Sequence, residues 1–260
     1  MVDTTKGSPD RFGYTWDRFA TLTPEQELQF EYWTKSITSV DGWRGKHFLD
    51  AGCGTGRNAY GAMKHGAASG VASDLDDRTL ERARRNLADF PTVAIRHESI
   101  YDLPYENEFD ISISIGVLQH LEHPKKAVAE LTKATKPGGR VLIWVYGYEN
   151  LEFYANVISP LRNALFSRLP LGLVRTLALV PTAMLWLMMK LGFKPFQYLR
   201  VLSTFPFRHV HHIVFGQMLP RTVHYFTKAE VLALFDGSGL RDVEAHWVNE
   251  CSWTVTGTKP

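Results

Sequence analysis

The hydrophobic and polar positions of the first 150 residues alternate in short blocks that predict strands and helices in turn. Two apolar runs, 47–50 and 70–74, each end in an acidic residue, and a glycine-rich loop follows the first. Segment 78–87, with Asp77 as its predicted N-cap, carries leucine and alanine on one helical face. Segment 109–115 alternates with the period of a strand. This order predicts an α/β sheet built from parallel strands.

The same patterns predict the other regular elements outside residues 150–222. Helices are expected at 57–65, 124–134 and 228–236, and strands at 93–96, 140–146, 241–248 and 253–258. A Pro-Gly-Gly sequence is expected to end the second helix before the next strand begins. Thr227 is the predicted N-cap of the last helix.

The pattern changes between residues 150 and 222, where strand spacing is lost. This stretch predicts several apolar helices that are interrupted at prolines 160, 170, 181, 195 and 206. Its longest apolar run, 177–189, has 13 residues, whereas a membrane span needs about 20. Two interpretations follow: a helical lid over a binding site, or a segment that lies in the surface of a membrane.

Charge is distributed unevenly along a chain whose net charge is only +2. No Asp or Glu lies between Phe153 and Thr227, and the same stretch carries eight Lys and Arg residues, which leaves the rest of the chain acidic. Such an asymmetry favours a partner surface for an anionic membrane or a nucleic acid. Long apolar runs separate the basic residues, and this spacing argues against nucleic acid.

The overall composition is that of a globular protein with one large domain and an insertion. Of the 260 residues, 45% are hydrophobic and 22% charged, which excludes a disordered or collagen-like chain. The two cysteines, Cys53 and Cys251, are too few and too far apart for a disulfide framework or a zinc site, so we expect a cytosolic location. Residues 1–16 lack the apolar core of a signal peptide.

The loop after the first strand has the composition of a cofactor-binding turn. Gly52, Gly54 and Gly56 allow close approach to a ligand, and the helix that follows offers free N–H groups. Arg57 stands where the dinucleotide fingerprint requires its third glycine, which argues against NAD or FAD. Asp74, at the end of the next strand, is placed to accept hydrogen bonds from a ribose.

Five segments together resemble the class I S-adenosylmethionine-dependent methyltransferases, in particular the UbiE- and UbiG-like branch (methyltransferase type 11). They are LDAGCGTGRN (49–58), GVASDLDDRTLERARRN (70–86), SIYDLPYENEFDISISIGVLQHLEHP (99–124), KPGGRVLIWV (136–145) and HYFTKAEVLALFDGSGL (224–240). The resemblance implies a Rossmann-like sheet of seven strands, the last of them antiparallel, with helices on both faces. It divides the chain into an N-terminal aromatic and helical cap (1–44), a methyltransferase domain (45–148 and 222–260) and a helical insert after the fifth strand (149–221).

The resemblance also implies the cofactor S-adenosylmethionine and a set of residues that bind it. The residues implied for its methionine end are Asp50, Gly52, Gly54 and Gly56, and those for the ribose are Asp74 and Leu75. Ser99 and Ile100 would lie beside the adenine, and Ile115 and Gly116 would lie beside the sulfonium. Ser99 departs from the family pattern, because many relatives have an aspartate there. Glu98 is the alternative acceptor for the adenine amino group.

Methyl transfer needs alignment of the acceptor and, for many acceptors, removal of a proton. His120 is the first candidate for the base and His224 the second. The alternative interpretation is that these histidines serve only in packing. His209 and His212, with Tyr14 and Trp16 of the cap, are candidate acceptor contacts. No metal site is expected around the insert histidines, because no carboxylate or thiolate lies near them in the sequence.

The function expected from these residues is methyl transfer to a small or lipid-linked lipophilic acceptor, such as a quinone-like or polyprenyl-linked molecule. The insert would then serve as a lid that also touches an anionic membrane, and the protein would be cytoplasmic and peripheral. Three alternatives stay open: a sugar or natural-product methyltransferase with a soluble phosphorylated acceptor, a nucleic-acid methyltransferase, and a cofactor-binding protein without transfer activity.

Overall fold

The structure, a computed structural model, describes residues 22–166, 169–220 and 222–260. One seven-stranded sheet has the order β3-β2-β1-β4-β5-β7-β6. Its strands, in chain order, are β1 (His47–Ala51), β2 (Ser69–Asp74), β3 (Val93–His97), β4 (Phe109–Ile115), β5 (Thr135–Tyr146), β6 (Arg241–Val248) and β7 (Ser252–Thr258). β7 is antiparallel to both of its neighbours, and the other pairings are parallel. The expected α/β class, strand number and antiparallel last strand are confirmed.

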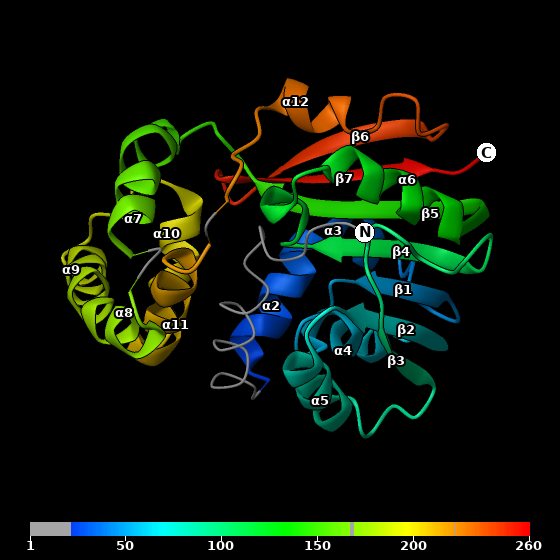
Figure 1. Ribbon diagram of the computed structural model, residues 1–260, viewed down its shortest axis with the longest axis horizontal. Helices are drawn as coiled ribbons and strands as arrows, with labels where there is room; N and C mark the ends of the chain where they lie inside the picture. The colour runs from blue at the N-terminus through cyan, green and yellow to red at the C-terminus, as the bar shows by residue number, and fades with distance from the viewer. Residues whose placement is uncertain (1–21, 167–168, 221) are drawn as a thin grey trace.

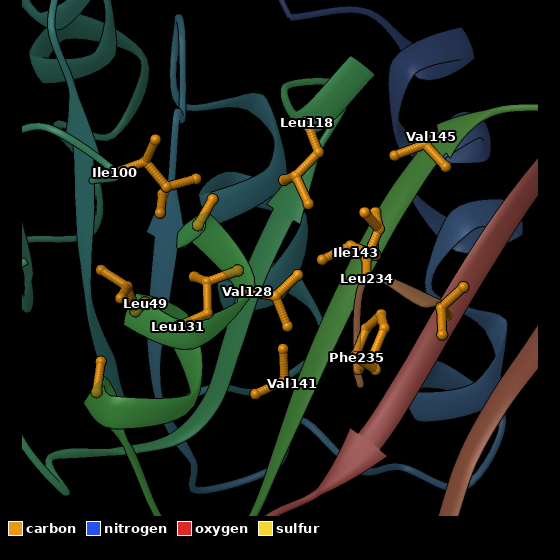
Figure 2. Close-up of a cluster of buried hydrophobic side chains, with 14 of the residues drawn as sticks. Leu49, Ile100, Leu118, Val128, Leu131, Val141, Ile143, Val145, Leu234 and Phe235 are labelled. Carbon is orange, nitrogen blue, oxygen red and sulfur yellow. The ribbon is translucent and has the colours of Figure 1, made fainter. Parts of the chain in front are cut away.

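Helices cover both faces of the sheet. One face carries α2 (Pro24–Trp33), α3 (Lys35–Thr38), α4 (Arg57–Lys64) and α5 (Asp77–Asn86), and the other carries α6 (Pro124–Ala134) and α12 (Lys228–Ala233). Successive side chains of β5 alternate between the two cores, so Leu142 and Trp144 face α2 while Val141 and Ile143 face α6. Figure 2 shows the second core, where side chains from α6 meet those of β5 and the end of α12.

Local signals in the sequence place most of these elements within one or two residues. α12 begins at the expected cap, since Thr227 accepts from the Glu230 N–H and the Glu230 carboxylate accepts in return. The cap of α5 differs from the expected Asp77: Asp76 accepts from the backbone N–H of Arg78, and the helix begins at Asp77. β5 begins at Thr135, five residues earlier than expected, because the Pro-Gly-Gly segment forms an irregular pairing with β4 rather than a break.

The insert forms a separate helical lobe beside the carboxyl ends of the parallel strands (Figure 1). It comprises a π-helical turn η2 (Tyr154–Ile158) and the helices α7 (Ser159–Phe166), α8 (Leu171–Leu177), α9 (Leu179–Lys190), α10 (Gln197–Leu202) and α11 (Phe207–Gln217). The lobe has two small apolar cores of its own. Prolines 160 and 181 lie in the first turns of α7 and α9 rather than between helices, as a missing N–H is tolerated there.

α8 and α9 together form one helical segment, Leu171–Lys190, with a mean hydropathy of 1.7. By length and composition this segment could cross a bilayer, although the 13-residue apolar run alone is too short for a span. Within the lobe, however, it packs along one side against α11, through Val174 and Ala178, which contact Phe215 and Leu219. The helix therefore forms a wall of the lobe with one buried and one exposed side.

The lobe is attached to the sheet at the turn between β6 and β7. The Tyr198 N–H donates to the Asn249 carbonyl at 3.0 Å, and the Gln197 N–H donates to Glu250 Oε2 at 2.6 Å. At the other end, the Gln217 amide donates to the Tyr146 hydroxyl at 2.9 Å. Because Tyr146 ends β5, these bonds fix the lobe over the carboxyl edge of the sheet.

Candidate functional site

A cavity of about 770 Å³ lies between the carboxyl ends of the strands and the insert lobe. Residues from β1, β2 and β4 and the loops after them line one end, and residues from η2 to α11 line the other. Loop residues at the carboxyl ends of parallel strands are the usual ligand-binding positions in open α/β sheets. The two ends of this cavity differ in chemistry.

The glycine loop forms the floor of the first end. Gly52 and Gly54 line the cavity with φ angles of 79° and 53°. A Cβ on Gly52 would lie only 2.5 Å from Val117 Cγ2, so this position requires glycine. Gly56 does not line the cavity; a Cβ there would meet the Leu87 side chain, so its role is the packing of α4 against α5. Contact between Gly56 and the cofactor stays a prediction.

Asp74 supports this loop and faces the same end of the cavity. Its Oδ2 accepts from the Gly54 N–H at 2.9 Å, and its Oδ1 accepts from the Asp76 N–H at 3.1 Å. Burial raises the pKa of Asp74, although these backbone bonds oppose the shift. A carboxylate oxygen has lone pairs for more than one donor, so Asp74 can also accept from ribose hydroxyls. Leu75 follows it in the lining, as expected.

Asp50 lies behind the glycine loop instead of on the cavity wall. It is fully buried, and its Oδ2 accepts from the Ala59 N–H at 3.1 Å in the first turn of α4. Burial raises the pKa of Asp50 to about 7. Asp50 is outside the cavity lining, and its carboxylate positions the N-terminus of α4, so its contact with the methionine end stays a prediction.

Of the two candidate acceptors for the adenine amino group, Glu98 lines the cavity and Ser99 does not. Ser99 is not in the lining, because its hydroxyl accepts from the Tyr101 N–H at 3.2 Å. Glu98 lines the cavity; its Oε1 accepts from the Tyr105 hydroxyl at 2.8 Å, and its buried Oε2 has no hydrogen-bond partner among the described residues. Buried polar atoms are normally paired, so Glu98 Oε2 points to a ligand donor such as an amino group. Ile100 lines the same wall, as expected.

His120 lines the cavity and packs edge-on against Tyr146, with the ring centroids 5.9 Å apart. Its Nδ1 is 3.0 Å from the Thr222 carbonyl oxygen, which can only accept, so Nδ1 carries the proton and Nε2 does not. Burial lowers the pKa of His120 to about 4. The imidazole is therefore neutral at physiological pH and has a lone pair on Nε2.

The cavity lining also carries aromatic and cationic groups that no sequence motif identifies as site residues. Trp33, Trp144 and Tyr146 line the cavity, and the Arg57 guanidinium lies 5.0 Å from the centroid of a Trp33 ring. Burial lowers the pKa of Arg57 to about 10. Arg57 could have been found from its place in the glycine motif, whereas Trp33 and Trp144 belong to strands and helices whose sequence predicts only packing.

The remaining candidates divide between the cavity and the surface. His209 and His212 of α11 line the cavity, and burial lowers the pKa of His212 to about 3. His224 is exposed and outside the lining, so the structure does not bring it into the site. Tyr14 and Trp16 lie outside the described residues. In residues 22–166, 169–220 and 222–260, no three His, Cys, Asp or Glu side chains are grouped to hold a metal.

Comparison with known proteins agrees with this arrangement. Residues 49–143 match the family model described as a methyltransferase domain. The chain is therefore similar to methyltransferase domains over less than half of its length. The matched residues of this methyltransferase domain include the glycine loop, Asp74, Glu98 and His120.

Two curated relatives and one solved structure illustrate the similarity. The chain is 34% identical to demethylmenaquinone methyltransferase of Clavibacter sepedonicus over 138 residues, which is 52% of this chain and 54% of that protein. It is 31% identical to a ubiquinone biosynthesis O-methyltransferase of Neisseria meningitidis serogroup C over 137 residues, 48% and 54% of the two chains. The magnesium protoporphyrin IX methyltransferase of Synechocystis PCC 6803, solved with bound S-adenosylhomocysteine, superposes with a TM-score of 0.57 at 12% identity and covers 97% of both chains.

The sequence matches leave the insert outside the similarity. The chain spans about half the length of the curated relatives it matches, and the family model ends at residue 143, before the insert begins. The methyltransferase domain therefore accounts for the first end of the cavity. The second end is lined by the insert, which lies outside the matched residues 49–143.

Proposed function

We propose that this protein is an S-adenosylmethionine-dependent methyltransferase that acts on a small or lipid-linked lipophilic acceptor. The observation that carries the proposal is the single cavity, which joins the cofactor end of the methyltransferase domain to an apolar chamber under the insert. A methyl donor at one end and an acceptor at the other would meet beside Ile115, Gly116 and His120.

The residues at the first end fit the cofactor. Asp74 would accept from the ribose hydroxyls, Glu98 Oε2 would accept from the adenine amino group, and Gly52 and Gly54 would leave room for the methionine end. The cofactor supplies a methyl group on a positively charged sulfur, which makes the methyl electrophilic. The chain holds the reactants in line and excludes water, and both contributions lower the barrier to displacement.

His120 would receive a proton from the acceptor. Its Nδ1–H is committed to the Thr222 carbonyl, which leaves Nε2 as the basic nitrogen. The low pKa keeps the imidazole in its basic form at neutral pH, although it also makes His120 a weak base. This role suits an acceptor whose proton is acidic, such as a phenol, or one whose proton leaves after methyl transfer has begun.

The apolar lining of the second end supports a lipophilic acceptor. Ile158, Leu161 and Leu165 from η2 and α7 face Leu185 of α9 and Leu202 of α10 across this chamber. Leu161 and Leu165 are also 55% and 56% exposed, so they lie at the rim where the cavity opens. The printed names of the curated relatives refer to quinone biosynthesis, and we extend this substrate class to the present chain as part of the proposal.

The outer face of the insert supports attachment to a membrane. An exposed apolar stripe follows one side of the α8–α9 segment at alternating spacings of four and three residues: Leu173, Leu177, Val180, Met184, Leu187 and Leu191. Arg175 and Lys190 are exposed on the same segment, and no ion pair involves them among the described residues. A helix with this pattern suits the surface of an anionic membrane on its cytoplasmic side, from which a lipid-linked acceptor would enter past Leu161 and Leu165.

Incubation with labelled S-adenosylmethionine and a fractionated lipid extract of the host tests this function. We expect label to enter a lipid fraction, and mass spectrometry of that fraction would identify the acceptor. Label in the aqueous fraction alone would favour a soluble acceptor. Binding of the cofactor without label in any fraction would favour a cofactor-binding protein that transfers no methyl group.

A further inference from the structure

The acceptor end of the cavity contains a buried arginine without an acidic partner. Arg162 of α7 lines the cavity and is only 4% exposed. Its Nη1 donates to the Gln217 carbonyl, and its Nη2 donates to Ser159 Oγ at 3.2 Å and to Asn163 Oδ1 at 2.7 Å. All three acceptors are neutral. A charge that is removed from water is normally paired with an opposite charge, so this arrangement is incomplete.

One donor of this guanidinium is also unused. Nε of Arg162 is buried and has no hydrogen-bond partner among the described residues. A guanidinium presents its donors as a planar fork that matches the oxygens of a carboxylate or phosphate. The unpaired Nε and the missing counter-charge are therefore both explained by a ligand with a carboxylate or phosphate group.

The surroundings explain why the chain itself supplies no counter-charge here. No Asp or Glu occurs between Phe153 and Thr227, so no helix of the lobe can offer one. Among the described residues that line the cavity, the acids are Asp74, Asp76 and Glu98, and all three belong to the cofactor end. Arg162 affects the pKa of Tyr154, Tyr225 and His120, and none of these side chains is a carboxylic acid.

The position of Arg162 also places a bound anion close to the reaction centre. The cation lowers the pKa of His120 and opposes the rise that burial imposes on the pKa of Tyr154. Tyr154 packs edge-to-face on Tyr225 with ring centroids 6.0 Å apart, and both rings line the cavity. Leu161, the neighbour of Arg162, marks the apolar rim.

We infer that Arg162 binds an anionic oxygen group, a phosphate or a carboxylate, on the head of the methyl acceptor, whose apolar part extends toward α7 and α9. This inference rests on the proposed function and narrows its substrate class to acidic amphiphiles. Arg162 is thus a binding and specificity residue, and the exposed Arg175 of α8, which lies outside the cavity lining, is its natural control.

The test uses three probes below their critical micelle concentrations and the full chain saturated with S-adenosylhomocysteine. Dodecyl phosphate carries chain and anion, dodecyl maltoside carries the chain alone, and glucose 6-phosphate carries the anion on a soluble sugar. We expect calorimetry to show that the wild type binds dodecyl phosphate at least tenfold more tightly than dodecyl maltoside. Tight binding of glucose 6-phosphate as well would identify a soluble phosphorylated acceptor as the source of the anion.

Variants then locate the anion. Arg162→Gln should lose the preference for dodecyl phosphate, Arg162→Lys should keep part of it, and Arg175→Gln should behave as the wild type. Equal affinity of the wild type for dodecyl phosphate and dodecyl maltoside would overturn the inference without reference to any variant, as would a full preference retained in Arg162→Gln.

Binding of S-adenosylhomocysteine separates this inference from the proposed function. It should be unchanged in all three variants, which also shows that they fold. A loss confined to Arg162→Gln would assign the guanidinium to the carboxylate of the cofactor and overturn the acceptor assignment. Failure of the wild type to bind the cofactor at all would instead overturn the proposed function.

Discussion

Nδ1 of His120 lies 3.0 Å from the carbonyl oxygen of Thr222, so the turn after β4 is tied to the segment that returns from the insert. The backbone supports the same link, because the His224 N–H donates to the Gln119 carbonyl at 2.8 Å. The candidate base therefore takes its tautomer from a residue 102 positions away, on the far side of the insert. Movement of the lobe would alter the orientation of His120 as well as the shape of the cavity.

Replacement of Asp74 by Asn should weaken S-adenosylmethionine binding at least tenfold. Hydrogen bonds to a charged acceptor contribute about 1.5–3 kcal/mol each, and about 1.4 kcal/mol corresponds to a factor of ten in affinity. Calorimetry on the wild type and on Asp74→Asn measures the change. Asp89→Asn, at an exposed carboxylate, is the control. Wild-type affinity in Asp74→Asn would show that the ribose is held elsewhere.

Replacement of His120 by Ala should lower kcat and leave the dissociation constant for S-adenosylmethionine unchanged. A positioned general base contributes about 10²–10⁴-fold to a rate, and His120 lines the cavity. Single-turnover transfer and cofactor titration separate the two effects. His224→Ala should keep full activity, because that side chain is exposed. An undiminished rate in His120→Ala would mean that alignment alone carries the reaction.

The melting temperature should fall as the pH is lowered from 6.5 to 4. Burial lowers the pKa of His120 to about 4 and that of His212 to about 3, so the unfolded chain binds protons in this range that the folded chain does not. Asp50 acts in the opposite direction: burial raises its pKa to about 7, so its ionisation destabilises the fold as the pH rises from 4 to 7. Burial also raises the pKa of Asp74 and lowers the pKa of His209 and His211, so four imidazoles outweigh two carboxyls.

Variants test that account of acid sensitivity. His212→Gln should lose less of its melting temperature between pH 6.5 and pH 4.5 than the wild type, because one imidazole that resists protonation is gone. His246→Gln, at an exposed histidine, should follow the wild-type curve. Scanning calorimetry at both pH values gives the comparison, and identical curves for all three proteins would remove His212 from the explanation.

Binding to vesicles of phosphatidylglycerol should exceed binding to phosphatidylcholine and should fall with salt without reaching zero. The cations of the insert supply the part that salt screens, and the stripe on α8–α9 supplies the apolar part that salt does not screen. Met184→Ser with Leu187→Ser should reduce the salt-resistant binding about tenfold. Val40→Ser is a matched control, since Val40 and Met184 are both 68% exposed. If the wild type ignored anionic vesicles at low salt, the insert would be a lid alone.

The sequence predicted the sheet well because its signals are local and strong. β4 and α6 have the expected bounds, since alternation defines the first and Pro124 begins the second. The N-cap of α5 is Asp76 and not the predicted Asp77, because several adjacent aspartates in the sequence could each cap this helix. β5 begins at Thr135 because this residue pairs with Phe109 of β4, although the Pro-Gly-Gly sequence that follows predicts a break before the strand.

The site was less predictable, because its second half is assembled from segments far apart in the chain. Motifs identify Gly52 and Asp74, which lie close to their motif neighbours. Arg162 is one of eight cations in the insert, and the sequence gives no sign that Arg162 is buried in the cavity while Arg175 remains outside it. Tertiary packing decides which of these side chains lies in the cavity. The same holds for Glu98, which lines the cavity, and Ser99, which does not.

β7 follows β6 in the chain but lies between β6 and β5 in the sheet. During synthesis, therefore, the sheet cannot close until the whole insert and both strands of this hairpin have left the ribosome. Until then α10 has no anchor at Asn249 and Glu250, and the apolar helical segment 171–190 of the same lobe is free to meet a chaperone or a lipid surface. The order of the strands thus gives the nascent chain an interval in which the insert is exposed before the cavity exists.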